Sequence, residues 1–309
     1  MNGPLLRAPV LWLTQNRAFR ALATRTPIGR AVASRFVAGE DLDAAVRVCR
    51  ELEGRGIGAV LDHLGENVTA PAQAADAAAA YVAALERMRR EPGLHAYISV
   101  KLTQLGLDFS SELCIEYMEG VLAAAREADR LVMIDMESSV YVDRTLDVFG
   151  KLRSRHDRVG LCLQTYLRRT PRDVDELPGG SVIRLVKGAY LEPPEVVLGS
   201  RREVAAAFAR LAATLLERGH TVHVATHDPA LIAGAERFVE RRGLASDRVE
   251  YQMLYGVRRD LQARLASNGR PVRVYVPYGS EWYPYLTRRL AERPANMWFF
   301  LSNLVRMRR

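Results

Sequence analysis

The sequence has little cysteine and no apolar run long enough to cross a membrane. Its three cysteines, Cys49, Cys114 and Cys162, lie far apart and form no CxxC pair, which argues against a disulfide framework and fits a reducing compartment. Each is best interpreted as a small core residue. A membrane span needs about 18 apolar residues. Arg7 interrupts the apolar stretch at the N-terminus, so we expect no signal peptide. The sequence predicts a cytoplasmic protein and leaves peripheral contact with a membrane open.

Lysine is scarce in a chain that is otherwise basic. Only Lys101, Lys151 and Lys187 occur, although lysine and arginine together number 44 and the formal net charge is +8. A basic balance favours an anionic partner such as a nucleic acid, a phosphate-bearing cofactor or a membrane surface, and a general bias toward arginine explains it equally well. Two of the three lysines fall at the ends of predicted strands, where a compact ammonium differs chemically from a guanidinium fork.

Several motifs that carry chemistry are absent. There is no Walker loop, no Gly-x-Ser-x-Gly elbow and no zincin helix. The glycine-rich stretch 54–58 precedes a predicted strand instead of joining a strand to a helix, so it is a poor dinucleotide fingerprint. On the strand that carries three histidines, only His223 and His227 share a face, about two pleats apart. This spacing argues against a metal site.

A regular alternation of strand-like and helix-like segments fills the chain instead. Eight short apolar runs have strand length, and many are rich in β-branched residues. They span residues 58–64, 96–102, 131–136, 159–164, 182–187, 221–226, 248–254 and 272–277. Helical patterns lie between most of them, for example at 72–91 and 201–218, and Asp228-Pro229 fits the start of another helix. Eight strands alternating with helices predict an α/β fold, a (β/α)8 TIM-type barrel, and disfavour an open doubly wound sheet.

The chain is expected to form one large domain with a short arm. Residues 1–40 are mixed and basic, with breaks at Pro27 and Gly29, and are predicted to be an N-terminal helical arm. Residues 41–309 then form the barrel, because α/β barrels of this size are usually one domain. Hydrophobic residues make up 49% of the chain, which is ample for a large core.

In such a barrel the active site lies at the C-terminal ends of the strands. The polar residues near the predicted strand ends are Glu66, Lys101, Asp135, Glu137, Gln164, Arg184, Lys187, Thr226, His227, Gln252 and Tyr275. Arg184 and Lys187 have opposite parity on one strand, so whichever points into the barrel needs a negative partner. Asp135 or a ligand phosphate would serve. A generic barrel also carries polar residues at these junctions, so the set is more informative than any single member.

The helix expected after the last strand has a polar face. Tyr285, Arg288, Arg289 and Glu292 follow the spacing i, i+3, i+4 and i+7. A solvated face with an Arg288–Glu292 pair explains this pattern most simply. Two adjacent guanidinium groups also suit bidentate binding of a substrate carboxylate, so both interpretations stay open.

Nine segments, taken in order, resemble the proline dehydrogenase family. They are LGE (64–66), SVKLTQLG (99–106), IDMES (134–138), LQTYLRR (163–169), RLVKGAY (184–190), ATHD (225–228), YQMLYG (251–256), VRVYVPYG (272–279) and YLTRRLAERPAN (285–296). The likeness runs over roughly residues 41–305, and the size resembles the monofunctional bacterial form. The family implies FAD bound at the barrel mouth, oxidation of L-proline to Δ1-pyrroline-5-carboxylate, and electron transfer to a membrane quinone.

The resemblance also implies a role for individual residues. It places the substrate against Lys101, Asp135, Tyr190, Leu254, Tyr275, Arg288 and Arg289. It places the FAD against Asp135, Gln164, Arg184, Val186, Lys187, Gly188, Ala189, Thr226 and His227. Asp135 and Arg184 are implied as catalytic, with Asp135 paired to Lys101 and Arg184 beside the flavin N5 region. Glu66 is implied as a gate that pairs with Arg288.

Two other classes of function compete with the flavin enzyme. Lys101 or Lys187, each at a strand end, could supply the amine of a Schiff-base aldolase. A basic module that binds RNA or membranes would cluster lysine and arginine with aromatic residues, whereas the arginines here are spread along the helices. The expected partners are therefore L-proline and a membrane quinone, and nucleic acid is not expected.

Overall fold

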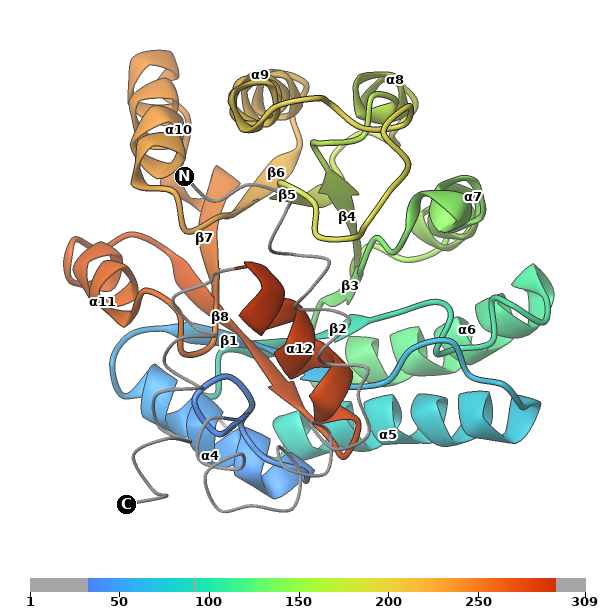
Figure 1. The fold of residues 1–309 in the computed structure, drawn as a ribbon. Helices are drawn as coiled ribbons and strands as arrows, with labels where there is room; N and C mark the ends of the chain where they lie inside the picture. Colours follow the sequence, from blue (N-terminus) through green and yellow to red (C-terminus); the bar gives the residue numbers. More distant parts are fainter. Residues whose placement is uncertain (1–32, 92, 293–309) are drawn as a thin grey trace, which may run out of the picture.

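The computed structural model describes residues 33–91 and 93–292. Eight parallel strands pair in sequence order, and β8 pairs with β1, so the sheet closes into a barrel (Figure 1). The strands are β1 Gly58–His63, β2 Ala96–Val100, β3 Val132–Ile134, β4 Val159–Gln164, β5 Val182–Val186, β6 Thr221–Ala225, β7 Val249–Leu254 and β8 Val272–Tyr278. Each falls within or beside a predicted run, so the barrel expected from the sequence is confirmed. Most of the helical arm predicted for residues 1–40 lies outside the described residues.

An outer layer of helices surrounds the strands in Figure 1, and one further helix, α12, lies over the centre of the barrel in that view. The helices are α4 Leu42–Glu53, α5 Pro71–Arg89, α6 Ser111–Ala128, α7 Val142–Arg153, α8 Thr170–Asp175, α9 Arg201–Glu217, α10 Pro229–Arg242, α11 Arg259–Ser267 and α12 Trp282–Glu292. Two short 3-10 turns, Ser139–Tyr141 and Ser246–Arg248, join them to neighbouring elements. The helices predicted at 72–91 and 201–218 correspond to α5 and α9.

Local sequence signals set the helix starts. Asp228 caps α10 by accepting a hydrogen bond from the backbone N–H of Ala230, and Pro229 takes the first helical position, as the sequence predicted. Ser200 and Glu203 form a capping box at the start of α9. These two caps fix where the loops after β5 and β6 end and where helices α9 and α10 begin.

Alternation along the strands divides the core into two regions. Outward-facing strand residues and the inner helix faces form most of one large apolar cluster, which includes the buried Cys49 and Cys114. Cys162 is also buried but lies beside Arg184 on the inner face of β4. Inside the barrel the buried apolar cluster is small and consists of Val60, Tyr97 and Met133. Most of the other inward positions on the strands are polar, so the barrel interior is held together largely by hydrogen bonds and ion pairs.

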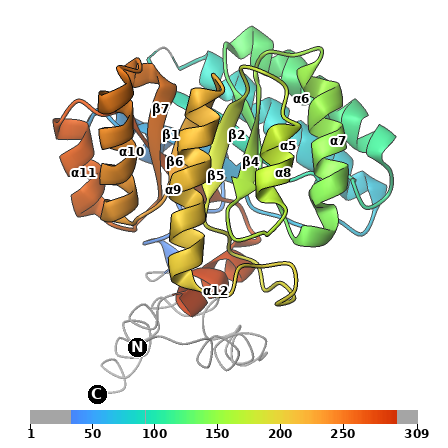
Figure 2. The same ribbon diagram turned by 90° about the horizontal axis from the view of Figure 1, so that it is seen from above.

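Helix α12 lies across one end of the barrel, as Figure 2 shows. A second small core, formed by Ala33, Phe36, Val37, Leu64, Trp282, Tyr283, Tyr285 and Leu286, packs the helix against the chain before α4. Trp282 Nε1 donates a hydrogen bond to Glu40 Oε1 at 3.1 Å, and the Ala38 N–H bonds the Pro277 carbonyl at 2.9 Å. Among the described helices, none has the length and apolar character needed to cross a bilayer.

Candidate active site

A cavity of about 560 Å³ opens at the C-terminal ends of the strands, the end at which TIM-type barrels place their active sites. Among the site residues implied by the resemblance, every one whose side chain the structure describes lines this cavity. The lining comprises Asp62, Glu66, Lys101, Asp135, Met136, Cys162, Gln164, Arg184, Val186, Lys187, Gly188, Ala189, Tyr190, Ala225, Thr226, His227, Asp228, Gln252, Met253, Leu254, Tyr275, Tyr285 and Arg289. The fold therefore brings these separate motifs to one place.

Lys101 lies between two carboxylates on the cavity floor. Its Nζ donates to Asp62 Oδ1 at 2.7 Å and lies 3.8 Å from Asp135 Oδ2. Burial alone would lower the pKa of Lys101, but the two carboxylates raise it well above its usual value. The ammonium is therefore held in its charged form. The expected Lys101–Asp135 pair is present at ion-pair distance, while the direct hydrogen bond goes to Asp62, a residue that was not predicted from the sequence.

Arg184 is the inward-facing member of the Arg184–Lys187 pair, and Asp135 is its negative partner. The Arg184 side chain is buried, and its Nη1 donates to Asp135 Oδ1 at 2.6 Å and to Ser99 Oγ at 2.8 Å. The Tyr275 hydroxyl donates to the other oxygen of Asp135 at 2.6 Å, and the guanidinium carbon lies 5.2 Å from the Tyr275 ring centroid. Asp135 thus joins Lys101, Arg184 and Tyr275 in one constellation.

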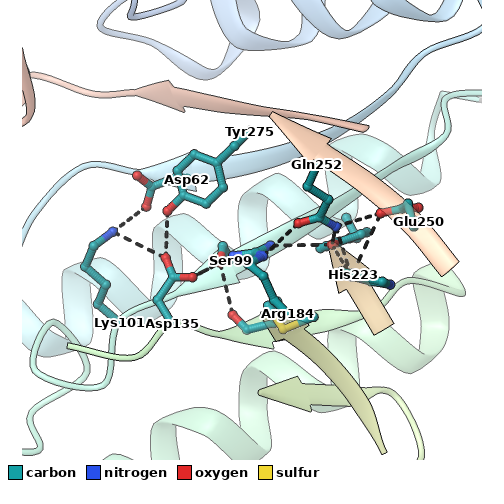
Figure 3. Close-up of polar contacts among 11 residues, drawn as sticks. Asp62, Ser99, Lys101, Asp135, Arg184, His223, Glu250, Gln252 and Tyr275 are labelled. Atoms are coloured by element: carbon teal, nitrogen blue, oxygen red, sulfur yellow. Dashed lines mark hydrogen bonds and ion pairs between the residues drawn. The ribbon is translucent and has the colours of Figure 1, made fainter. Parts of the chain in front are cut away.

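A second polar group continues from Arg184 toward the N-terminal ends of the strands and lies to the right of Arg184 in Figure 3. Arg184 Nε donates to Gln252 Oε1 at 2.8 Å. The Gln252 amide nitrogen in turn lies 2.6 Å from Glu250 Oε1 and 2.9 Å from His223 Nδ1. Burial lowers the pKa of His223 to about 4, so the ring is neutral at neutral pH and its Nδ1 accepts hydrogen bonds.

Arg273 closes this group at the far end. Its Nε donates to both oxygens of Glu250, at 3.0 and 2.9 Å, and its guanidinium carbon lies 4.7 Å from the Tyr97 ring centroid. The Arg273 Nη1 also donates to the His95 carbonyl at 2.7 Å. A Cβ at Gly58 would lie 2.8 Å from that nitrogen, so glycine at this position lets the arginine pass over β1.

The rim of the cavity carries a second lysine. Lys187 Nζ donates to Asp228 Oδ2 at 2.8 Å, which links the loop after β5 to the start of α10. His227 Nε2 accepts a hydrogen bond from the backbone N–H of Leu254 at 3.0 Å, so in the neutral ring the proton is on Nδ1. Gly188 has a φ of +115°, and a Cβ there would lie 2.2 Å from Cδ1 of Tyr166. This residue therefore has to be glycine for the loop to follow its path.

A buried carboxyl group supports the wall of the cavity. Glu137 accepts hydrogen bonds from the N–H of Thr103 at 3.0 Å and from its hydroxyl at 2.5 Å. The Glu137 carbonyl accepts from Gln164 Nε2 at 2.8 Å, so this segment orients a side chain that lines the cavity. Burial raises the pKa of Glu137 from its ordinary value of 4.5 to about 7.

Helix α12 contributes Tyr285 and Arg289 to the cavity lining, and the Arg289 guanidinium carbon lies 5.2 Å from the Tyr285 ring centroid. This position supports the carboxylate-binding interpretation of the helix face over the solvated one for Arg289. The side chain of Arg288 lies outside the described residues, and so do its expected pairs with Glu66 and Glu292. Those pairings stay predictions.

Asp62 was not predicted from the sequence, and neither were Tyr97, Glu250 and Arg273 of the second polar group. The alternation of side chains along each strand is the signal that could have found them. It shows which residues point into the barrel even when their partners are not known. Asp62 has the same parity as Val60, and Tyr97 the same parity as Ser99 and Lys101. Charged residues at inward positions of a barrel strand require buried partners of opposite charge. Several such residues in one barrel are therefore expected to contact one another.

The sequence of this chain is similar to those of known proteins that share one family. Residues 45–301 match the proline dehydrogenase family. The chain is 38% identical to the proline dehydrogenase of Deinococcus radiodurans, across 99% of this chain and 100% of that protein. It is 35% identical to proline dehydrogenase 1 of Bacillus subtilis, across 98% of this chain and 100% of that protein.

A solved structure gives the same fold. Proline utilization A (PutA) from Bdellovibrio bacteriovorus, inactivated by N-propargylglycine, matches with a TM-score of 0.80 and 22% identity. The match covers 91% of this chain and 37% of that longer one, so this chain corresponds to part of the longer protein. The sequence matches over nearly the full length, together with the barrel, establish that the chain belongs to the proline dehydrogenase family.

Proposed function

We propose that this protein oxidises L-proline to Δ1-pyrroline-5-carboxylate with FAD bound in the barrel-mouth cavity, and that the electrons pass to a membrane quinone. The observation that carries the proposal is the convergence of Lys101, Asp135, Arg184, Tyr275 and Arg289 on one cavity. Family membership supports proline as the substrate. The protein would act in the cytoplasm, with peripheral contact to the membrane that holds the quinone.

The residues of the cavity suit a flavin nucleotide. Its volume of about 560 Å³ lies within the usual range for cofactor sites. Arg184 supplies a buried positive charge, which stabilises negative charge on a reduced flavin. Lys187 supplies an ammonium at the rim, where it can meet a diphosphate. Gln164, the segment 186–189, Thr226 and His227 would make the remaining contacts.

Proline is a small zwitterion, so binding its carboxylate fixes the rest of the ring. Arg289, together with Arg288, would bind the carboxylate through paired N–H donors. Lys101 would add a second positive charge from the cavity floor. Tyr275, Tyr190 and Leu254 would form the walls around the ring, and Glu66 would control access to it. A fixed carboxylate determines where C5 of the ring lies, and the oxidation requires C5 to be held in a defined position relative to the flavin.

Bound FAD supplies the hydride acceptor for C5 of proline. The chain itself orients the substrate and sets the charge around it. Asp135 holds Arg184 and Tyr275 through its two oxygens, so one carboxylate aligns a positive group with a substrate-facing ring. No covalent nucleophile is needed, in agreement with the absence of any nucleophile motif from the sequence.

The site geometry argues against a Schiff-base aldolase. A nucleophilic lysine needs a neutral amine and therefore a lowered pKa. Asp62 and Asp135 raise the pKa of Lys101 well above its usual value instead. Lys187 is bound to Asp228 at 2.8 Å and lies at the rim. Neither lysine is placed as an activated amine.

The visible spectrum of the purified protein tests the proposed function. We expect a flavin absorption band near 450 nm that L-proline bleaches without oxygen. A soluble quinone should restore the band, and anionic vesicles should retain the protein in a sedimentation assay. A colourless protein that takes up no FAD on reconstitution would contradict the proposal. Borohydride trapping of a substrate on Lys101 or Lys187 would favour the aldolase.

A further inference from the structure

We propose that Gln252 is a positioning residue that holds Arg184 in place, and that the Glu250–Arg273 ion pair fixes the Gln252 amide. This inference rests on the proposed function, because it assigns these residues an effect on the bound flavin. Gln252 lies on β7 and Arg184 on β5, and the two side chains meet inside the barrel (Figure 3). The Glu250–Arg273 pair, at the N-terminal end of the barrel, would thereby influence the position of Arg184 at the proposed cofactor site.

Four groups hold the Arg184 guanidinium: Asp135, Ser99, Gln252 and the Tyr97 hydroxyl. Asp135 and Ser99 accept hydrogen bonds from Nη1, at 2.6 and 2.8 Å, whereas Gln252 Oε1 accepts from Nε at 2.8 Å. The guanidinium group is planar, and contacts that all meet at Nη1 would leave the plane free to turn about that nitrogen. The contact from Nε to Gln252 at 2.8 Å removes this rotation, together with a longer contact from Nη2 to the Tyr97 hydroxyl at 3.4 Å. The Gln252 amide nitrogen itself lies 2.5 Å from that hydroxyl, so the same glutamine supports both contacts. Gln252 therefore sets the plane in which the positive charge faces the cavity.

The orientation of the Gln252 amide is fixed from both sides. Arg184 presents a donor, so it requires the amide oxygen. Glu250 Oε1 is an acceptor and lies 2.6 Å from the amide nitrogen. The Tyr97 hydroxyl oxygen lies 2.5 Å from the same nitrogen. A reversed amide would turn its oxygen toward a carboxylate and its N–H groups toward a cation, so the reversed form is excluded.

The ion pair beyond Gln252 holds Glu250 in turn. Arg273 Nε contacts both carboxylate oxygens, and the side chains of Glu250 and Arg273 are 14% and 18% exposed. From Asp62 to Arg273 the charges alternate in sign along Lys101, Asp135, Arg184 and Glu250, and Gln252 is the neutral link. Because each charge has an opposite neighbour, a change at one end disturbs the positions of the others.

Two variants separate positioning from charge. Gln252→Met keeps the length of the side chain and removes both hydrogen-bonding ends. Loss of a hydrogen bond to a charged group should slow flavin reduction at saturating proline by about tenfold or more. The flavin midpoint potential should become more negative, because the positive charge is no longer fixed toward the cavity. The KM for proline should stay within about twofold, since the carboxylate binds elsewhere.

Glu250→Gln keeps the shape of the side chain and removes its charge. If Glu250 acts by positioning, the potential should again become more negative. A purely electrostatic role predicts the opposite sign, because removing a negative charge makes flavin reduction easier. The double variant should be no worse than Gln252→Met alone, since both changes act through the same contact.

The control is Glu236→Gln. Glu236 pairs with Arg270 at 3.0 Å, as Glu250 pairs with Arg273, but it lies on α10 in the outer helical layer. Its removal should leave the potential and the reduction rate unchanged.

The experiment is a redox titration and a stopped-flow reduction of each FAD-loaded variant. A wild-type protein without FAD would contradict the proposed function. A wild type that proline reduces, beside a Gln252→Met variant with unchanged potential and rate, would overturn this inference alone. If Gln252→Met fails to fold, Glu250→Gln decides: a more negative potential supports positioning, and a rise or no change overturns it.

Discussion

Lys101 and Asp62 form a buried ion pair inside the barrel, with Nζ 2.7 Å from Oδ1 and side-chain exposures of 7% and 1%. Asp135 lies 3.8 Å from the same nitrogen. The lysine is thus closer to a carboxylate on β1 than to the one that also holds Arg184 and Tyr275. Asp135 is therefore available to accept hydrogen bonds from Ser99, Arg184 and Tyr275, while Asp62 balances most of the lysine charge.

Removal of either member of the Lys101–Asp62 pair should strand the other charge in the barrel interior. We expect Lys101→Met and Asp62→Asn each to lower the free energy of unfolding by about 3–5 kcal/mol. The double variant should lose less than the sum of the two changes. Urea unfolding of the three variants measures this. Asp135→Ala should couple more weakly to Lys101→Met, since that contact is longer.

The chain offers a matched exposed pair as a control. Lys151 contacts Asp147 at the same 2.7 Å, but both side chains are about half exposed. Lys151→Met should change the free energy of unfolding by less than about 1 kcal/mol. Strict additivity of Lys101→Met and Asp62→Asn would show that the two residues act independently.

Arg289 and Arg288 should be required for substrate binding. Loss of a charge-assisted contact to the proline carboxylate costs about 2–4 kcal/mol, so Arg289→Met and Arg288→Met should each lower kcat/KM roughly 30- to 1000-fold. The FAD content should survive, because the proposed flavin contacts lie on other elements. Arg172→Met, at an exposed arginine on α8, serves as the control. Near-normal kinetics in either α12 variant would support a solvated helix face at that position.

Tyr275 should discriminate between proline and its 4-hydroxylated analogue. If the carboxylate is fixed, the ring cannot slide, so an added hydroxyl at C4 must displace the tyrosine or be buried without a partner. Proline should be preferred over trans-4-hydroxy-L-proline by roughly ten- to a few-hundredfold in kcat/KM. Steady-state kinetics with an acceptor dye measure the ratio.

Two Tyr275 variants separate the ring from its hydroxyl. Tyr275→Ser should narrow the preference, mainly because proline loses packing. Tyr275→Phe keeps the ring and loses the 2.6 Å hydrogen bond to Asp135, so it should keep the preference while slowing the reaction. Equal kcat/KM values for the two substrates in the wild type would remove Tyr275 as a selectivity element.

The fold could be predicted because its signals are local. Each strand is a short apolar run with turns on both sides, and the helix start at Asp228 depends on neighbours in the sequence. The count of eight strands then favoured a closed barrel. Most residues of the cavity lining could also be predicted from their positions at strand ends, because all strands of a parallel barrel end at the same rim.

Pairing inside the barrel could not be predicted in the same way. Asp135 and Asp62 both point inward, and which one bonds Lys101 depends on the register between β1, β2 and β3. Register is a relation between distant segments that a single sequence does not reveal. The packing of α12 on Phe36 and Val37 is equally nonlocal, because it joins the two ends of the described chain.

Glu137 should make the stability of the protein depend on pH near neutrality. The residue is 3% exposed, and burial raises the pKa of its carboxyl group from 4.5 to about 7. Between these values the folded protein binds a proton more strongly than the unfolded chain does. The free energy of unfolding should therefore fall as the pH rises from about 4.5 through about 7, by up to about 3 kcal/mol from this group.

The Glu137→Gln variant isolates this contribution. Its amide can accept from the Thr103 N–H and donate to the Thr103 hydroxyl, so it imitates the protonated carboxyl group without titrating. Urea unfolding at pH 5, 6, 7 and 8 should show the wild type losing stability relative to the variant, with most of the difference developed by pH 8. Parallel curves would mean that Glu137 stays ionised in the folded protein across this range. In that case its two contacts with Thr103 would compensate the cost of burying the charge.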